Sequence, residues 1–341
     1  MSKVSCFLLL MLPFACLAQQ EKQEKQQDVV MFYNLENLFD PVRDSSINDT
    51  DFLPEGRYGW TWRKLKTKIN AIAKTIIAAG NGNAPALVGV CEAENRYVLK
   101  RLTEQTPLAK TGYNIVHRDS PDPRGIDVAL LYRPDRFTVL HAAWFKVCYD
   151  SGSCRTREIL YAKGVLRELD TLHIFVNHWP SKLGGAEKSE PRRMRAAETL
   201  RAVTDSVFCT NPHANILVMG DFNDTPGSRP VIEGLRAVSD TVCPDCLHSL
   251  MLPLALRGEG SLKYRKKWEL IDLFFVSGNL LDKSEPVYCD PAETAIFRAP
   301  FLLEADEKFL GDKVRRTYEA GRYKGGASDH LPVVLKLTEG Y

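Results

Sequence analysis

The chain has 341 residues, a formal net charge of +2, 44% hydrophobic residues and 26% charged residues. This composition is typical of a folded globular protein and excludes a largely disordered or fibrous chain. Because the net charge is close to zero, no global field attracts nucleic acid, and any binding of a polyanion must come from a local cluster of charges.

The N-terminus has the composition of a secretory signal peptide. Lys3 precedes the apolar stretch VSCFLLLMLPFACLA, which is too short for a comfortable membrane span, and residues 16–18 resemble a small-residue cleavage site. We therefore expect a signal peptide over residues 1–18, a flexible leader over 19–28, and an exported chain, periplasmic or secreted, with no transmembrane segment once mature. A lipid anchor through Cys16 is the alternative, although residues 13–15 fit a bacterial lipobox poorly.

After the leader, short apolar strands alternate with a few helices. Apolar runs predict strands over residues 28–33, 86–90, 126–132, 164–169, 172–179, 215–220, 270–276 and 332–337. Apolar residues at helical spacing predict helices over 62–80, which ends in a glycine, and over 190–208, which has a proline near its start. Residues 290–324 show no regular pattern. Without a linker or repeat, we expect one α/β (α+β) domain over 29–338, with two sheets face to face and helices outside.

The cysteines suggest structural use in an exported protein. Of the nine cysteines, Cys6 and Cys16 lie in the predicted signal peptide, so seven remain and at least one is free. The pair at positions 148 and 154 brackets a turn and could close a hairpin. The CPDC motif over 243–246 could be a tight disulfide, a redox motif or half of a metal site. No second CxxC and no thioredoxin-like pattern accompany it, so we favour a structural role.

Polar and ionisable side chains recur where the predicted strands end or are about to begin. They are Asn34, Glu36, Glu92, His178, Asp221, Asn223, Asp329 and His330. Each alone is more often a turn or structural residue than a catalyst. Their joint occurrence at strand ends favours a shared site.

Asp272 differs from these residues because it lies within a predicted strand. Ile271 and Leu273 flank it, and an ionised carboxylate without a partner in apolar surroundings would be costly. Asp272 therefore needs a cation or a hydrogen-bonding partner.

The motifs FYNLEN, GVCEAEN, RGIDVALLYRP, VNHWPSK, GDFNDTP, LIDLFFVS and SDHLPV follow one another between Val29 and Leu337. In this order they resemble the endonuclease/exonuclease/phosphatase superfamily, whose fold is DNase-like, and within it the exported bacterial branch that carries NHWPSK and SEPRR. The resemblance implies a four-layer αββα sandwich of two mainly antiparallel sheets with outer helices. It also implies phosphoester hydrolysis.

That chemistry needs neutralised phosphate oxygens, an activated water and a stabilised leaving oxygen. Carboxylate and amide oxygens suit Mg²⁺ or Mn²⁺ rather than zinc. We expect Glu92 as the principal metal ligand, supported by Glu36, Asn34 and Asp329. The family often has an aspartate at the position of Glu36, so this longer side chain could contact the metal through a water.

Asp221 is expected to orient and deprotonate the attacking water. Asn223 lies on the same face of the extended segment and is expected to hold the phosphate or the water. His330 is expected to donate to a phosphate oxygen, with Asp272 as the partner that holds its tautomer and keeps it cationic.

His178 is expected near the leaving oxygen, with Asp127 as its partner. Several basic residues surround these motifs in sequence, and of these Arg124, Lys182 and Arg193 are candidates for binding the phosphate. A solvated charged helix face is the other interpretation of the basic residues.

These residues predict a phosphodiesterase that depends on Mg²⁺ or Mn²⁺, with a nuclease as the first interpretation. Two histidines favour diester cleavage, because a poor alkoxide leaving group benefits from an acid. The partner would then be a phosphoester substrate such as nucleic acid, and no obligate protein partner is predicted. A phosphomonoesterase or phospholipase-type phosphatase is the alternative, and a catalytically dead binding module ranks third.

Overall fold

The computed structural model describes residues 25–149, 152–238 and 242–340. The predicted signal peptide, the Cys16 anchor and most of the leader lie outside these residues. Strand β1 (Gln27–Leu38) begins two residues before the predicted domain.

The first sheet has the strand order β13-β19-β1-β2-β4-β3, with β14 also paired to β19. Besides β1, its members are β2 (Leu87–Ala93), β3 (Asn114–His117), β4 (Asp127–Tyr132), β13 (Val287–Cys289), β14 (Ala295–Ile296) and β19 (Val333–Glu339). Strands β1 and β2 are parallel, and the other pairs are antiparallel. Helix α1 (Trp62–Ala79) connects the parallel pair, and α2 (Arg96–Glu104) follows β2.

The second sheet has the order β5-β6-β7-β8-β12-β9. Its members are β5 (Phe137–Phe145), β6 (Ile159–Leu166), β7 (Asp170–His178), β8 (Asn215–Asp221), β9 (Leu247–Ser249) and β12 (Asp272–Ser277). Here β7 and β8 are the parallel pair, and α3 (Ala186–Thr210) connects them. A π-helix, η3 (Pro230–Leu235), and the short α4 (Leu252–Leu256) follow β8.

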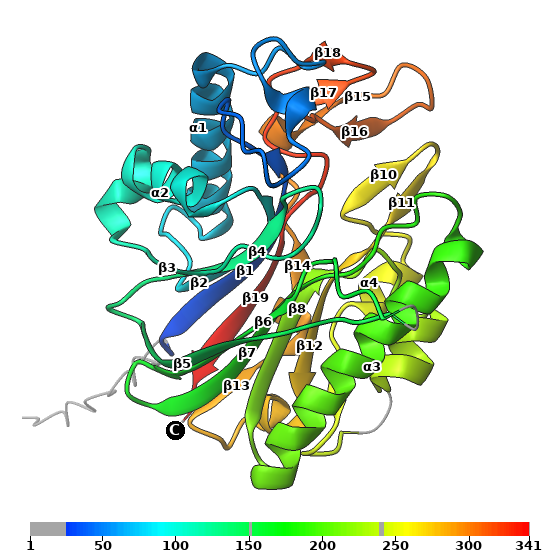
Figure 1. Cartoon of the computed structure of the whole chain (residues 1–341). Coiled ribbons are helices and arrows are strands. Elements are labelled where there is room, and N and C mark those ends of the chain that lie inside the picture. Colours follow the sequence, from blue (N-terminus) through cyan, green and yellow to red (C-terminus); the bar gives the residue numbers. More distant parts are fainter. Residues whose placement is uncertain (1–24, 150–151, 239–241, 341) are drawn as a thin grey trace, which may run out of the picture.

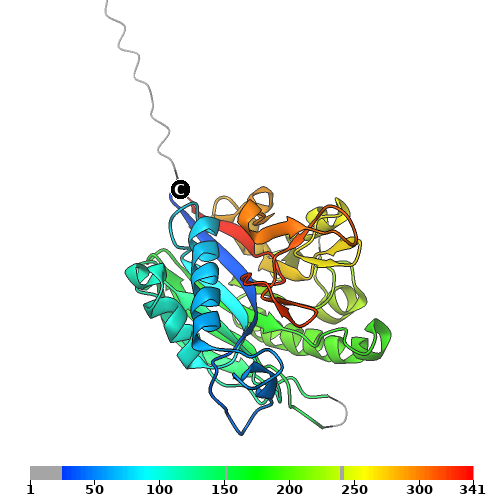
Figure 2. The same ribbon diagram turned by 90° about the horizontal axis from the view of Figure 1, so that it is seen from above.

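The two sheets pack face to face because alternate residues of the central strands are buried on opposite sides. In β1, Val30 and Phe32 belong to the core between the sheets, whereas Met31 and Tyr33 pack beneath α1 and α2. Figure 1 shows α1 and α2 outside the first sheet and α3 outside the second, and the view from above in Figure 2 agrees. The predicted four-layer αββα sandwich is therefore confirmed.

The two long helices form where their apolar spacing predicts them. In α1, Leu65, Ile69, Ile72 and Ile76 are buried against the first sheet, Thr61 caps the N-terminus, and the helix ends at Gly80. Helix α3 starts four residues before the predicted boundary, and Pro191 lies inside it.

Strands β6 and β7 form an antiparallel hairpin, and β6 begins and ends earlier than the strand predicted over residues 164–169. Three smaller hairpins gather at the end of the sandwich where β1 and β8 finish (Figure 1). They are β10 (Leu262–Tyr264) with β11 (Lys267–Glu269), β15 (Leu303–Ala305) with β16 (Asp312–Val314), and β17 (Tyr318–Glu319) with β18 (Arg322–Tyr323). Short helices complete the chain: η1 (Thr50–Phe52), η2 (Pro107–Thr111), η4 (Gly278–Leu281), η5 (Pro291–Glu293) and η6 (Pro300–Leu302). The segment 290–324, which has no regular pattern in sequence, thus contains two of the hairpins and several short elements.

Cys148 forms a disulfide with Cys154, as the hairpin interpretation allows, and Cys243 forms one with Cys246, which decides among the alternatives for the CPDC motif. The remaining cysteines of the described residues, at positions 91, 209 and 289, are free. Among the described residues, no helix is both long and apolar enough to cross a bilayer.

Gly220 allows β8 to lie close against β7 directly before Asp221. A Cβ at this position would lie 2.5 Å from the backbone oxygen of Asn177 and 2.6 Å from its Cβ, so even an alanine would force the two strands apart. Gly227 is a matched control, since a Cβ there meets no atom within 4 Å.

We expect Gly220→Ala to lower the free energy of unfolding by about 1–3 kcal/mol, as overpacking does. Gly227→Ala should change it by less than about 0.5 kcal/mol. Urea denaturation of both variants measures the difference. Equal stability of the two variants would show that β7 and β8 tolerate separation.

Candidate active site

The polar residues at the strand ends converge at one end of the sandwich. Because β7 and β8 are parallel, their carboxyl ends coincide, and His178 pairs in register with Asp221. The antiparallel β12 brings Asp272 opposite Asp221 on the other side. Asn34, at the end of the apolar part of β1, donates from Nδ2 to Oδ2 of Asp221 over 3.0 Å and thereby joins the two sheets.

The backbone at these strand ends turns sharply. Glu36, Asn37, Glu92 and Asn223 have φ between 48° and 60°, the left-handed region that side chains with a Cβ rarely adopt. The register of β1 with β2 shifts between Asn34 and Leu38. Such conformations are costly and concentrate at functional sites, so the fold keeps them here at the expense of local stability.

Glu92 reaches the space between the sheets from the first sheet. Its Oε2 accepts a hydrogen bond from Asn37 N over 2.9 Å, and Oε1 lies 3.9 Å from Nε2 of His178. The same His178 nitrogen lies 3.8 Å from Oδ2 of Asp221. Glu92, His178 and Asp221 therefore surround one small volume.

Asp221 is 2% exposed, and both of its oxygens accept hydrogen bonds, from Asn223 N at 2.8 Å and from Asn34. Burial, together with the negative charge of Asp272, raises the pKa of Asp221 to about 7. A carboxyl group that titrates near neutral pH is suited to act as a general base.

His330 and Asp272 form the pair that the sequence predicts. Nδ1 of His330 lies 2.7 Å from Oδ2 of Asp272, and Nε2 lies 3.9 Å from Asp221 and from Asp329. Burial opposes the charged ring, but the charge and hydrogen bond of Asp272 prevail and raise the pKa of His330 well above its usual value. The ring is therefore a cation that presents Nε2–H to the site.

The predicted pairing of His178 with Asp127 is wrong. Asp127 Oδ2 lies 3.1 Å from Nε2 of His117, and Oδ1 accepts from Ser120 N. Nδ1 of His178 has no hydrogen-bond partner among the described residues. Burial, with the charge of Arg157 next in size, lowers the pKa of His178 well below its usual value, so the ring is neutral. Asp127 lies at the start of β4, which pairs with β3, and His117 is on β3. The sequence did not predict β3.

Arg157 is a site residue that the sequence did not reveal. Its buried guanidinium donates to the backbone oxygens of His178 and Trp179 and forms a 2.8 Å ion pair with Asp122. It therefore fixes the chain directly after β7. The residues next to Arg157 in the sequence do not indicate this role, because its partners are more than twenty positions away in the chain.

Lys68 is a second such residue. It lies on the buried face of α1 and donates from Nζ to Thr317 Oγ1 and to the backbone oxygen of Ala327. Burial lowers the pKa of Lys68 to about 8, against the opposing charge of Glu36 and, to a lesser degree, Asp329. The sequence could have indicated that Lys68 is buried, because this lysine falls among the apolar residues that recur at helical spacing.

Glu36 is engaged by protein donors. Thr317 N donates to its Oε2 over 2.7 Å, and Arg316 Nε donates to Oε1 over 3.3 Å. Arg316 also forms a 2.6 Å bond with Oδ2 of Asp329. Burial and the charge of Asp329 raise the pKa of Glu36. Glu36 thus lies at the edge of the ligand set, which fits contact with a metal through water better than direct coordination.

The predicted phosphate-binding residues separate in the structure. Arg193 is 1% exposed, and its guanidinium donates to Asp224, Ser189 and Ala186 O, so it holds the start of α3 and cannot reach a substrate. Its assignment to substrate binding is therefore wrong. Arg124 is exposed and bonds Asn37 Oδ1 beside Glu92.

Lys182 is one-third exposed and lies 3.5 Å from Asp224 and 3.6 Å from Glu269. Arg124 and Lys182 therefore remain candidates for contact with a substrate.

The donor set fits a hard divalent cation. The predicted ligands Asn34, Glu92 and Asp329 all end in oxygens. Ligand atoms of Asp221, Asp272 and His330 lie within 4.8 Å of one another, and the buried Oδ1 of Asp272 has no hydrogen-bond partner among the described residues. Carboxylate and amide oxygens favour Mg²⁺ or Mn²⁺. Cys91 lies within ligand distance of His178 and Asp221, but burial raises its thiol pKa well above the usual value, so it does not compete as a thiolate.

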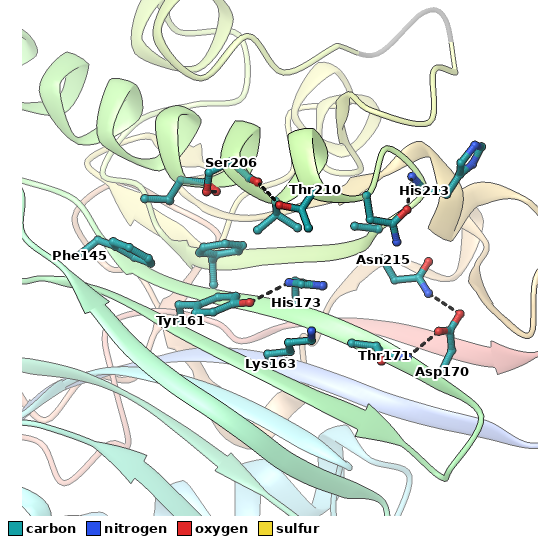
Figure 3. A pocket seen from close by; sticks show the side chains of 15 residues that line it. Phe145, Tyr161, Lys163, Asp170, Thr171, His173, Ser206, Thr210, His213 and Asn215 are labelled. Atoms are coloured by element: carbon teal, nitrogen blue, oxygen red, sulfur yellow. Dashed lines mark hydrogen bonds between the residues drawn. The ribbon is translucent and has the colours of Figure 1, made fainter.

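A separate cavity of about 470 Å³ opens between α3 and the outer face of the second sheet (Figure 3). Tyr161, Lys163 and His173 line it, and it extends to Asp170 and Asn215 at the start of β7 and β8. It therefore lies at the opposite end of these strands from His178 and Asp221, and no predicted site residue lines it.

A family model for the Endonuclease/Exonuclease/phosphatase family matches residues 29–339. No curated protein matches the chain. One similar solved structure is the human Nocturnin catalytic domain with bound sulfate, with 16% identity, a TM-score of 0.56, and coverage of 92% of this chain and 94% of that chain. Another is an endonuclease/exonuclease/phosphatase family protein from Bacteroides thetaiotaomicron, with 15% identity, a TM-score of 0.55, and coverage of 93% of this chain and 99% of that chain. A third is D. rerio TDP2 complexed with single strand DNA product, with 14% identity, a TM-score of 0.54, and coverage of 91% of this chain and 98% of that chain. At these identities the likeness shows a common fold.

The raised pKa of Asp221 has a consequence for stability. Between about pH 4 and pH 7 the unfolded chain ionises this carboxyl while the folded chain keeps the proton, so the folded state loses stability as the pH rises. We expect Asp221→Asn to stabilise the metal-free protein by about 1–3 kcal/mol at pH 8 and to have little effect near pH 4. Urea denaturation in EDTA at both pH values measures this. A variant that is no more stable than the parent at pH 8 would contradict the expectation.

Proposed function

This chain belongs to the Endonuclease/Exonuclease/phosphatase family, and we propose that within it the protein is a phosphodiesterase, specifically a nuclease, that depends on Mg²⁺ or Mn²⁺. The observation that carries the proposal is the position of Asp221, between the cationic His330 and the neutral His178 and across from Glu92. The candidate base, a cationic ring and the candidate metal ligand thus share one volume.

Bound by Glu92, Asn34 and Asp329, a divalent cation would neutralise charge on the phosphate oxygens of the substrate. Asp221 accepts the proton of the attacking water. Asn223 donates its Nδ2 to Trp179 O over 3.0 Å, so its side-chain oxygen is left to accept from that water. This favours the water, rather than the phosphate, as the group that Asn223 holds.

His330 donates from Nε2 to a non-bridging phosphate oxygen. Asp272 stabilises the charge on that ring and fixes its orientation. His178, held by the Arg157 clamp on its backbone, presents a neutral N–H to the leaving oxygen. Both rings lie within 4 Å of Asp221 and would serve any phosphoester whose leaving group is an alkoxide, diester or monoester alike.

One similar structure, D. rerio TDP2, is complexed with single strand DNA product, and we take this as support for nucleic acid as the substrate. A phosphomonoesterase or phospholipase-type phosphatase on the same fold is the competing proposal, and the substrate panel below separates them.

With Mg²⁺ or Mn²⁺, we expect the mature protein to cleave bis(p-nitrophenyl) phosphate and at least one of DNA and RNA, and EDTA to abolish both activities. Asp221→Asn should lower kcat by about 10²–10⁴-fold, because it removes the base. Asp170→Asn, at the other end of the same sheet, is the matched control and should leave kcat unchanged. Faster release of inorganic phosphate from monoesters than cleavage of any diester would favour the phosphatase instead.

We also propose that the protein is exported. The sequence over residues 1–18 has the features of a signal peptide, and two disulfides are typical of proteins outside the cytoplasm. Expressed in a bacterial host, the protein should be recovered from the periplasm or the medium. Its mass, measured by mass spectrometry, should be that of a chain cleaved after Ala18. A lipid-modified N-terminal Cys16 would show the membrane-anchored alternative instead.

A further inference from the structure

A groove of about 280 Å³ lies beside the catalytic residues. The β10–β11 hairpin forms one wall, and the β15–β16 hairpin, with the segment that follows it to Glu319, forms the other. Asp329 lines its inner end. We call this feature the hairpin groove; Figure 1 shows its hairpins together at the end of the sandwich.

The hairpin groove is fixed to the catalytic pair. Leu262, the first residue of β10, bridges to His330, and Leu331 N donates to Ser261 O over 2.7 Å. The hydroxyl of Ser261 accepts from Asp272 N over 3.3 Å. Because the base of the hairpin contacts both His330 and Asp272, a substrate held at the scissile phosphate has the groove as its immediate continuation.

The cations of the hairpin groove are of two kinds. Three are neutralised by nearby carboxylates: Lys263 by Asp306 at 2.9 Å, Lys313 by Glu304 and Glu319, and Arg316 by Glu36 and Asp329. They hold the walls in place.

Arg265 and Lys308 line the groove but have no carboxylate partner among the described residues. Each lies instead over the ring of its sequence neighbour, Arg265 5.2 Å from the centroid of Tyr264 and Lys308 5.2 Å from that of Phe309. Tyr264 is 58% exposed. The groove thus offers two free cations, each beside an aromatic ring.

We infer that the hairpin groove binds a single-stranded segment of nucleic acid next to the scissile phosphate. Two free cations, one beside the exposed ring of Tyr264 and one beside the partly buried ring of Phe309, match what such a strand presents, a row of phosphates and unpaired bases that can stack. A duplex keeps its bases stacked inside and has no use for the rings. The inference rests on the proposed function, because it names the substrate of the same site.

Binding can be separated from catalysis in the inactive Asp221→Asn background. We expect a fluorescent oligothymidylate of about twelve nucleotides to bind with an affinity that falls with salt. Adding Arg265→Ala and Lys308→Ala should reduce the slope of log K against log salt by about 1.4, the value for two lost phosphate contacts on a single strand. The matched control, Lys100→Ala with Lys110→Ala on the far helical layer, should leave the slope unchanged.

Tyr264→Ala tests stacking independently of charge. It should weaken oligothymidylate binding about tenfold without changing the salt slope, and Tyr264→Phe should restore the affinity. Equal affinity for a duplex of the same length would overturn the preference for single strands. Two outcomes would contradict the role of the hairpin groove in binding the strand. One is an identical salt slope in the parent and in the groove variant, which carries Arg265→Ala and Lys308→Ala. The other is binding to phosphatidylserine vesicles in place of the oligonucleotide.

The outcomes distinguish this inference from the proposed function. In the active background, the groove variant should lower kcat/KM for the oligonucleotide at least tenfold more than for bis(p-nitrophenyl) phosphate. If the parent cleaves bis(p-nitrophenyl) phosphate but the groove variant loses kcat/KM equally for both substrates, the hairpin groove does not bind the strand, and the proposed phosphodiesterase activity is retained. If the parent cleaves no phosphodiester, yet the groove variant loses oligonucleotide binding, the proposed reaction is wrong and the groove stands.

Discussion

Several carboxylates must share a small, poorly hydrated volume at one end of this sandwich, and their mutual repulsion constrains everything around them. They are Glu36, Glu92, Asp221, Asp272 and Asp329. The chain counters them with internal cations from three separate regions: Lys68 on α1, Arg316 after β16, and His330 before β19. The arrangement holds only when both sheets and the hairpins are in place, so the catalytic end of the molecule depends on the whole fold rather than on one motif.

Those elements that bury an uninterrupted apolar face could be predicted from the sequence. Strand β1 is buried on both sides, and α1 has its apolar residues at helical spacing, so pattern and structure agree. Strand β5 could not be found this way, because most of its residues are only partly buried and no alternation survives. The structure of the segment 290–324 could not be predicted either. Its two-residue and three-residue strands are too short to show a hydrophobic period and depend on contacts with distant residues.

The site divides along a similar line. Asp272 within an apolar run signalled a partner, and His330 is that partner. Asp127 was expected to pair with His178, but its partner is His117 on the unpredicted β3. Proximity in sequence to a motif misled in the case of Arg193, which is buried. Arg157 and Lys68 bind backbone oxygens and a hydroxyl that only folding brings together. The spacing of Lys68 among apolar residues could have shown that it is buried, but the sequence does not show which groups either side chain binds.

The attachment of β10 to His330 and Asp272 gives its hairpin a rigid base and an exposed tip. Variation can therefore accumulate at Arg265 and its neighbours without disturbing the chemistry, whereas a change at Ser261 reaches the catalytic pair at once. Under the proposed function, such a division would let the preference for one substrate change into a preference for another while the rate of bond cleavage is retained. The tip of this hairpin is therefore the part of the molecule where substitutions disturb His330 and Asp272 least.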